Sequence, residues 1–336
     1  MILIDSVYIN NGGGLILLRY LVDYLKDRQD VFYLFDNRVS NIFEKSSIKD
    51  KKFISNSVLE RHLFYKENKE KFDKVFCFGN LPPTIRLNAK VLVYFHQPLF
   101  LNIPENFSFK NKISYNIKQI FLHYFKKNAD YWLVQSNYIA NNFSSKYLSR
   151  DNNKVIVAPF YPQLDFSNFI QERIPNSFLY VSNSSPHKNH YRLIEAFCLG
   201  FDELQEGSLV VTVPQTDIKL CECIQKKIDL GYPIKNVGFI DRERLIELYL
   251  SHEYLIFPSL AESFGLGLAE AIDGGCKIIA ADLSYTYEVC EPSLVFDPLS
   301  INSIEYAIVT AIQNELPCAK KLIENDISKL IQLLAE

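Results

Sequence analysis

Residues 258–282 read PSLAESFGLGLAEAIDGGCKIIAAD, and they contain the clearest structural pattern in the chain. The stretch follows on from an apolar run, YLIFPS, which is typical of a buried strand. It continues through a short loop, LAESFG, and then becomes LGLAEAID, which has the pattern of a helix. Strand, loop and helix in this order form the repeating unit of a doubly wound α/β sheet. Ligands of such sheets bind where the strand ends and the helix begins, so residues 260–265 are the first candidate site.

This loop and helix carry two carboxylates, Glu262 and Glu270, at the two ends of ESFGLGLAE. Between them lie Gly265 and Gly267, whose backbone amides can approach a phosphate closely because no Cβ is in the way. Carboxylates accept hydrogen bonds from sugar hydroxyls but repel phosphate. The order carboxylate, amides, carboxylate therefore fits a ligand built from a sugar, a diphosphate and a ribose. The alternative is an acid near a helix N-terminus and an unrelated surface glutamate.

Apolar runs alternate with helical segments along the whole chain. We expect strands at MILIDSVYI, VFYLF, KVFCFG, KVLVYFH and YWLVQS, and then at SFLYVSN, SLVVTVP, NVGFI, YLIFPS, KIIAAD and SLVFD. Such uniformly apolar runs indicate parallel sheets that are covered on both faces. Near the end of the chain, NSIE at 302–305 predicts a helix capped by Asn302.

The alternation is interrupted once, at 161–176, by a segment with two prolines and no hydrophobic period, which we interpret as a linker. The predicted organisation is a Rossmann-like domain over 1–160 and a second one over 177–317. A terminal helix within 318–336 is expected to pack back toward the first domain. The predicted fold class is α/β, with two doubly wound domains.

The distribution of charge, the cysteines and the apolar runs exclude several classes of protein. The net charge is −3, but residues 1–160 hold 23 basic and 14 acidic side chains, whereas the remainder holds 13 and 25. The seven cysteines are scattered, and the Cys221–Cys223 pair has no second pair to complete a zinc site, which favours reduced thiols in the cytoplasm. No run of eighteen uncharged apolar residues predicts a membrane-spanning helix, and MILIDSVYI, which contains Asp5, is typical of a strand rather than a signal peptide.

The motif ESFGLGLAEA resembles the E-x7-E motif of retaining glycosyltransferases of family 4, which have the GT-B fold. The similarity extends over 236–298, from NVGF through YEV to the closing DP. It implies two Rossmann-like domains that face each other across a cleft. It also implies that Glu262 faces the donor sugar near the reacting carbon and that Glu270 binds the ribose hydroxyls. The implied donor site includes Ser263, Phe264, Gly265, Leu266 and Gly267 between them, and Ile240 upstream. Many relatives have proline where this chain has Gly267.

The segment YVSNSSPHKNHYRLIEAF resembles the family's phosphate-binding segment, and Lys188 matches the lysine that neutralises the donor diphosphate. A lysine at a helix start is otherwise poorly placed against the helix dipole. Many relatives carry an arginine at the position of Asn183, and others carry one at the position of His187. Either His187 or Arg192 could replace the missing cation. The alternative for Lys188 is a solvated lysine in a turn.

In the first half, NNGGGLILLRYL follows the first expected strand. A dinucleotide fingerprint started at Gly12 fails, because its last glycine position is Leu17. In the GT-B family this loop lines the cleft, which indicates Gly13 and Gly14; the alternative is a tight turn.

His96 ends the strand KVLVYFH and resembles the family histidine that reaches the donor sugar, so we group it with Glu262 and Lys188 as catalytic. A structural histidine is the alternative. Ser136, between a strand and a helix, resembles a residue that lines the cleft.

The basic excess of the first half lies within 51–127, which holds 14 basic and 5 acidic residues. Residues 110–127 have Ile113, Ile117, Ile120, Phe121 and Tyr124 at helical spacing, with lysines at both ends. The pattern fits either a helix packed on the domain or a helix at a membrane surface. We expect the lysines Lys110, Lys112, Lys118, Lys126 and Lys127 to contact anionic lipid.

The resemblance implies transfer of a sugar from a nucleotide-diphosphate-sugar to an acceptor hydroxyl with retention of configuration. It implies no metal and no other cofactor, a glycan or lipid-linked glycan as acceptor, and no nucleic-acid partner. The richness in Asn, Ile, Lys and Tyr is typical of an AT-rich bacterial gene and favours surface polysaccharide assembly, such as O-antigen, capsule or lipopolysaccharide, in the cytoplasm or at the inner face of its membrane. The alternatives are a GT-B nucleotide-sugar epimerase and a non-catalytic partner subunit.

Overall fold

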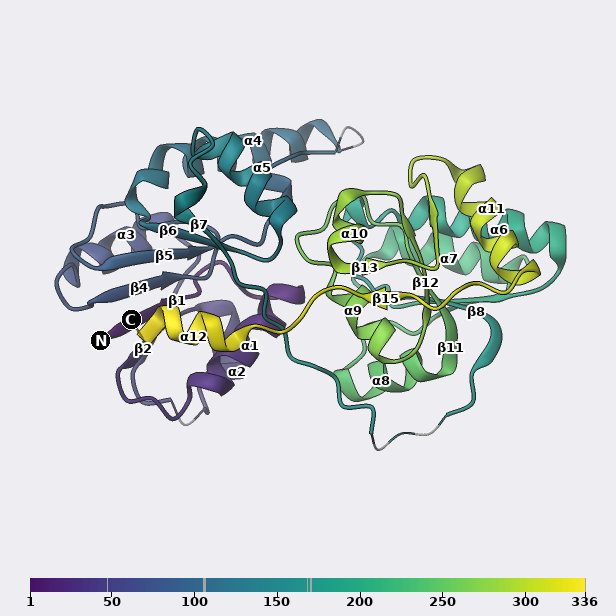
Figure 1. The fold of residues 1–336 in the computed structure, drawn as a ribbon, viewed down its shortest axis with the longest axis horizontal. Coiled ribbons are helices and arrows are strands. Elements are labelled where there is room, and N and C mark those ends of the chain that lie inside the picture. The colour runs from purple at the N-terminus through teal and green to yellow at the C-terminus, as the bar shows by residue number, and fades with distance from the viewer. Residues whose placement is uncertain (47, 105–106, 168, 170, 336) are drawn as a thin grey trace. The chain divides into compact units, whose positions relative to one another are not determined.

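The computed structural model describes residues 1–46, 48–104, 107–167, 169 and 171–335. The chain divides into two compact units (Figure 1): Met1–Pro162 together with Glu324–Glu336, and Gln163–Ile323. The division falls within the expected linker, but that linker is shorter than predicted because strand β8 already begins at Ile174. Pro175 is compatible with this strand because it lies in its exposed first part, before the pairing of β8 with its neighbour shifts register.

The first unit is built on a seven-stranded parallel sheet with the strand order β3-β2-β1-β4-β5-β6-β7. Its strands are β1 (Ile2–Asp5), β2 (Val31–Asp36), β3 (Lys51–Ile54), β4 (Lys74–Cys77), β5 (Lys90–Tyr94), β6 (Tyr131–Val134) and β7 (Val155–Val157). Its helices are α1 (Gly12–Leu25), α2 (Ser40–Phe43), α3 (Val58–Glu67), α4 (Phe109–Phe125), α5 (Asn137–Tyr147) and α12 (Ile327–Ala335). Figure 1 shows α3, α4 and α5 on one face of this sheet and α1, α2 and α12 on the other. Because the central strands are covered on both faces, they are mostly apolar, and Leu3, Val75, Val93 and Trp132 pack in one core.

The carboxyl ends of β1 and β4 are held together by buried polar contacts. Asp5 ends β1, and its Oδ2 accepts a hydrogen bond of 2.7 Å from Nε of Arg61 on α3, which is equally buried. The same arginine donates to the carbonyl oxygens of Leu81 and Pro82, so the buried charges are paired and bonded. The loops after β1 and β4 approach so closely that a Cβ on Gly79 would lie 2.3 Å from the carbonyl oxygen of Val7.

The C-terminal segment completes the first unit rather than the second. The expected helix over 318–336 is confined to α12, and residues 320–321 form the short strand β15 instead. Leu330 and Leu334 of α12 are buried, and Nζ of Lys74 donates to the carbonyl oxygens of Leu333 and Leu334.

The second unit has a six-stranded parallel sheet with the order β10-β9-β8-β11-β12-β14. Its strands are β8 (Ile174–Tyr180), β9 (Ser208–Val211), β10 (Ile234–Asn236), β11 (His252–Phe257), β12 (Lys277–Ala281) and β14 (Leu294–Phe296), with β13 (Cys290–Glu291) and β15 (Lys320–Lys321) as a separate antiparallel pair. Its helices are α6 (His190–Leu204), α7 (Ile218–Asp229), α8 (Arg242–Ser251), α9 (Leu266–Asp273), α10 (Ser284–Val289) and α11 (Ile301–Gln313). Both sheets follow the doubly wound order in which the first strand lies beside the fourth, so the predicted α/β class is confirmed.

Two local predictions in the second unit were wrong. The expected strand at NVGFI lies earlier, as β10, because Gly238 adopts φ +71° and turns the chain away from the sheet. The cap of α11 is Ser300 rather than Asn302: its side chain accepts from the amide of Ser303, and the helix already begins at Ile301.

Candidate functional site

The two strands that flank the switch point of the second sheet, β8 and β11, each lead into a loop and then a helix. Strand β8 is followed by the turn Pro186–Lys188 and by α6, and β11 is followed by residues 258–265 and by α9. Ligands of open α/β sheets bind at this position, beyond the carboxyl ends of the strands where the chain order reverses. The predicted loop over 260–265 and the helix from Leu266 are therefore confirmed, and they lie where the fold favours a ligand.

The site's lysine and its first glutamate form an ion pair. Nζ of Lys188 lies 2.5 Å from Oε1 of Glu262, and the two side chains are 14% and 13% exposed. The backbone beneath them is fixed, because the amide of Leu260 donates to the carbonyl oxygen of His187 at 2.7 Å and the hydroxyl of Tyr180 donates to that of Lys188 at 2.7 Å. The structure thus brings together two predicted site residues that are far apart in the sequence.

The helices that begin at this site start without a side-chain cap. Helices α7, α8 and α11 each start with a side chain that accepts a backbone hydrogen bond, from Asp217, Asp241 and Ser300. Helices α6 and α9 start instead at Asn189 and Gly265, and neither makes a side-chain cap bond. Both residues have positive φ, 63° and 67°. Uncapped amides at a helix N-terminus are suited to bind an anion, and here two such ends adjoin the Lys188–Glu262 pair.

The second glutamate belongs to a different cluster. Glu270 is 5% exposed, and its Oε1 lies 3.0 Å from a guanidinium nitrogen of Arg242, the first residue of α8. The hydroxyl of Tyr249 donates to its Oε2 at 3.4 Å. Burial, opposed by Arg242, raises the pKa of Glu270 to about 7. Glu270 therefore titrates near neutral pH, and Arg242 favours its ionised form.

Sequence reasoning missed Arg242 as a site residue, although its position at the start of a predicted helix could have indicated it. A cation at the first position of a helix faces the positive end of the dipole, which is unfavourable unless a carboxylate compensates it. The same reasoning had indicated Lys188. The structure supplies the missing partner, because Glu270 on α9 lies against the start of α8.

The remaining predicted residues of the second unit differ in accessibility. Phe264 is buried, Asn183 is exposed, and the others are half-buried: His187, Ile240, Ser263, Leu266 and Gly267. Gly267 is the second residue of α9, as the predicted helix LGLAEAID implied, and a Cβ there would meet only ordinary contacts with Phe257 and Tyr249.

The two candidates for the missing cation, His187 and Arg192, differ in their charge at neutral pH. Burial, with a contribution from Lys188, lowers the pKa of His187 to about 4, so this imidazole is neutral at pH 7. Arg192 keeps its charge, and its Nη1 donates to Oδ1 of Asn189 at 2.9 Å, at the start of α6. Asn183 uses its side-chain oxygen to accept from the amide of Ser185. Of the two candidates, only Arg192 is cationic near pH 7.

In the first unit, the predicted residues lie at the carboxyl ends of β1, β5 and β6. His96 packs on Phe78, and a Cβ on Gly14 would be 3.1 Å from its Cε1. Its Nε2 lies 3.0 Å from the carbonyl oxygen of Phe78, so Nε2 carries the proton and Nδ1 is the acceptor. Burial lowers the pKa of His96 to about 4. The imidazole is therefore neutral and can accept, but not donate, at Nδ1.

Gly13 and Ser136 have simpler surroundings. Gly13 is exposed in the first turn of α1, and a Cβ there would meet nothing within 4 Å. Ser136 caps α5, because its Oγ accepts from the amide of Ile139 at 3.3 Å. Capping α5 is a sufficient structural reason for a serine at position 136. The position of Ser136 in a cleft stays a prediction.

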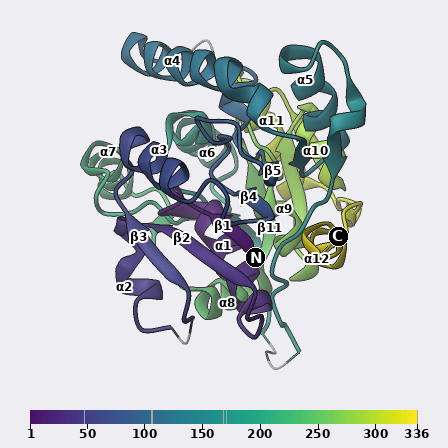
Figure 2. The same ribbon diagram turned by 90° about the vertical axis from the view of Figure 1, so that its left-hand side faces the viewer.

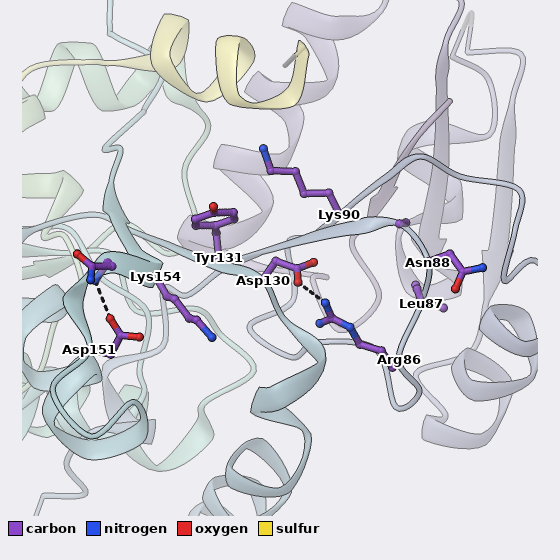
Figure 3. A pocket seen from close by; sticks show the side chains of 10 residues that line it. Arg86, Leu87, Asn88, Lys90, Asp130, Tyr131, Asp151 and Lys154 are labelled. Carbon is purple, nitrogen blue, oxygen red and sulfur yellow. Dashed lines mark hydrogen bonds and ion pairs between the residues drawn. The ribbon is translucent and has the colours of Figure 1, made fainter.

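A shallow pocket of about 620 Å³ lies at the opposite, amino-terminal ends of β5, β6 and β7 (Figure 3). Its lining includes Arg86, Lys90, Asp130 and Lys154, and Arg86 and Asp130 are joined by an ion pair. None of the predicted site residues lines this pocket, and its position at the wrong ends of the strands does not favour a catalytic role.

Two negative findings concern only the part of the chain that the structure describes. Within it, no cluster of three or more His, Cys, Asp or Glu residues has a geometry that could hold a metal ion. No helix among the described residues is long and apolar enough to cross a membrane.

Comparison with known proteins agrees with this arrangement. The family model described as "Glycosyl transferases group 1" matches residues 165–329. The chain is 26% identical over 141 residues to the O-antigen chain mannosyltransferase B of Escherichia coli, covering 41% of the chain and 37% of that protein. It is 29% identical over 157 residues to the O-antigen chain mannosyltransferase RfbU of Salmonella typhimurium, covering 46% and 42%. The matched regions thus span less than half the length of these relatives.

Among solved structures, Anabaena HepE in complex with UDP and glucose superimposes with a TM-score of 0.64 at 17% identity, covering 93% of this chain and 90% of that one. At this identity the likeness concerns the fold alone, and it extends over nearly the whole chain.

Proposed function

Because residues 165–329 match the family model of the group 1 glycosyl transferases and the chain has the GT-B fold, we propose that it transfers a sugar from a nucleotide-diphosphate-sugar to a hydroxyl of a glycan or lipid-linked glycan. The observation that carries the proposal is the Lys188–Glu262 pair at the switch point, beside two uncapped helix N-termini. This arrangement provides a cation and free amides for a diphosphate and a carboxylate for the sugar beside it.

The proposed reaction retains the configuration at the anomeric carbon. The acceptor oxygen forms a bond to that carbon while the bond from the carbon to the phosphate oxygen breaks. The acceptor's proton passes to the leaving phosphate on the same face of the sugar. Lys188 and the amides at the starts of α6 and α9 stabilise the charge on the leaving diphosphate, and Glu262 stabilises the positive charge that develops on the sugar. No protein nucleophile and no metal take part in this scheme.

The other predicted residues have supporting roles in the proposal. Glu270, held by Arg242, accepts hydrogen bonds from the ribose hydroxyls. In the first unit, the neutral His96 accepts a hydrogen bond from a sugar hydroxyl at Nδ1, and Gly14 leaves room beside it.

The sugar and the pathway are suggested by the relatives. The similar proteins of E. coli and S. typhimurium are named as O-antigen chain mannosyltransferases. We therefore propose mannose as the sugar and a surface polysaccharide of the O-antigen type as the product.

The test is a transfer assay with a panel of nucleotide-sugars, with and without lipid-linked and soluble acceptors, and with the configuration of the product determined by NMR. Product that requires an acceptor and retains its configuration supports the proposal. Epimerised donor without acceptor would favour an epimerase instead, and binding without any turnover would favour a partner subunit. An inverted product would disprove the retaining mechanism.

We also propose that the protein works in the cytoplasm, at the inner face of the membrane, and that the basic region at 51–127 contacts anionic lipid. Of the lysines expected to do so, Lys126 already donates from its Nζ to the carbonyl oxygen of Tyr147. The test variant therefore replaces Lys110, Lys112, Lys118 and Lys127 with glutamate. It should lose sedimentation with anionic liposomes and keep its affinity for nucleoside diphosphates. Sedimentation equal to that of the wild type would disprove this contact.

A further inference from the structure

Helix α4 carries an apolar stripe on its solvent-exposed side. Five large side chains form this stripe: Phe109, Ile113, Ile117, Ile120 and Tyr124, which are 80%, 43%, 61%, 70% and 67% exposed. At about 100° per residue, these positions fall within an arc of about 80° on the helix. They form one continuous strip rather than scattered apolar residues, and such strips are uncommon on the surface of a monomeric protein.

The opposite side of the same helix is the one that packs on the first unit. Leu122 is fully buried there, and Tyr115 packs its ring against Phe100 and Phe107. Figure 2 shows α4 along the outer edge of the unit. The stripe therefore has no role in holding α4 in place, because the helix already has an apolar face for that purpose.

The charges around the stripe are all positive. Lys110 and Lys112 lie on the helix near the borders of the stripe and Lys127 follows the helix, whereas Lys118 lies toward the packed side, with its Nζ over the ring of Tyr115. The sequence has no aspartate or glutamate between residues 107 and 129. Lysines beside an apolar stripe can extend their amines to lipid phosphates while the apolar side chains enter the layer below. A bilayer with anionic headgroups complements this pattern of charge and apolarity.

We propose that α4 lies flat in the headgroup region of an anionic membrane, with the stripe inserted among the acyl chains and the lysines at the level of the phosphates. The stripe is about 22 Å long at 1.5 Å per residue, which suits a helix that lies in the surface. This inference rests on the proposed membrane association and deepens it: lipid contact by lysines alone is abolished by salt, whereas an inserted stripe retains part of the binding.

The first experiment measures partition into anionic vesicles made of phosphatidylglycerol and phosphatidylethanolamine, at low and at 0.5 M salt (about a 4 Å Debye length). The variant with Ile117→Ser and Ile120→Ser should bind at least about tenfold more weakly at both salt concentrations. The matched control is Ile218→Ser, since Ile218 on α7 of the second unit is 66% exposed and should not affect partition. Unchanged thermal unfolding of both variants verifies that the fold is intact.

The second experiment places a reporter in the stripe. The only tryptophan of the chain, Trp132, is fully buried, so an added indole dominates any change in emission. Ile117→Trp should show a blue shift with anionic vesicles and quenching by lipids brominated on the acyl chains. Tyr306→Trp on α11, at a position that is 72% exposed, should show neither change.

Stripe variants that bind vesicles like the wild type, or an indole at position 117 that brominated lipids do not quench, would overturn the insertion. A wild-type protein that self-associates in solution, and becomes monomeric on Ile117→Ser and Ile120→Ser, would assign the stripe to a second copy instead. If the wild type ignores vesicles but transfers sugar to a soluble acceptor, both membrane proposals fail and the proposed transferase activity stands.

Discussion

Replacing Glu262 with glutamine should change binding and turnover in opposite directions. In the structure, the only charge that Lys188 is seen to contact, among the described residues, is the carboxylate of Glu262. A diphosphate that approaches Lys188 must therefore compete with this carboxylate and is repelled by it. Glutamine has nearly the same shape but no charge, so Glu262→Gln frees the lysine for the ligand.

The size of the effect follows from the geometry of the pair. At 2.5 Å and with 14% and 13% of the side chains exposed, the contact is a charge-assisted hydrogen bond that is largely shielded from water. Such bonds contribute about 1.5–3 kcal/mol net, and a factor of ten in affinity corresponds to about 1.4 kcal/mol. We therefore expect Glu262→Gln to bind nucleoside diphosphates about tenfold more tightly. Sugar transfer should fall by about a hundredfold or more, because the sugar loses its stabilising charge.

Isothermal titration with UDP and GDP, and with the corresponding nucleosides, measures the binding effect. Affinity for the nucleosides should stay the same, because they lack phosphate. Glu291→Gln is the matched control: Glu291 also pairs with a lysine, Lys320, but both side chains are well exposed and distant in sequence from the site. Diphosphate affinity that is unchanged or weaker in Glu262→Gln would refute the competition between Glu262 and the ligand.

Three further predictions concern the second unit. Lys188→Ala should weaken the binding of a nucleoside diphosphate about tenfold or more while leaving the nucleoside nearly unaffected; equal losses in titrations of both ligands would exclude a phosphate contact. The pKa of Glu270 is raised to about 7, so the folded protein binds this proton more tightly than the unfolded chain does, and the stability of the second unit should decline as the pH rises from about 4.5 to 7. Relative to Glu270→Gln, which cannot titrate, the wild type should lose up to about 3 kcal/mol over this range in denaturant unfolding, and parallel pH profiles would contradict the shift. Finally, EDTA should leave transfer unchanged, because Lys188 and two helix N-termini are proposed to balance the diphosphate charge; activity lost to EDTA and restored by magnesium or manganese would show that a metal does so.

The elements that sequence reasoning predicted correctly are those whose evidence is local. The boundary between the loop and α9 at Leu266 follows from glycines, a change of period and an apolar helix face, all within one short stretch. The helix over 110–127 was predicted from its spacing and is α4, Phe109–Phe125. Periodicity alone left open whether its apolar residues pack inside. The structure shows that one apolar side packs and the other is exposed.

The sequence alone could not predict which distant side chains form ion pairs or at which residue each helix begins. Nothing local connects Arg242 with Glu270, because a parallel sheet and two helices bring them together. The cap of α11 was assigned two residues too late, since Ser300 and Asn302 are both good caps and tertiary packing chooses between them. The φ of +85° at Tyr8, in the loop after β1, could not be predicted from the sequence, because tyrosine rarely takes this conformation.

The charges around the Lys188–Glu262 pair bear on how tightly the proposed substrate and product bind. Lys188 and Glu262 compensate each other's charge while they are paired. A bound nucleotide-sugar would bring about two negative charges on its diphosphate, and the nucleoside diphosphate that leaves carries about three, because its terminal phosphate has a second pKa near 6. Lys188, Arg192 at the start of α6 and two helix N-termini of about half a charge each supply about three positive charges. Glu262 offsets about one of them, so about two remain, which match the substrate and not the product. Asn183 adds no charge, and His187 is neutral at pH 7. The charge balance of this chain therefore favours the donor over the diphosphate product, and the return of Glu262 to Lys188 would help that product to leave.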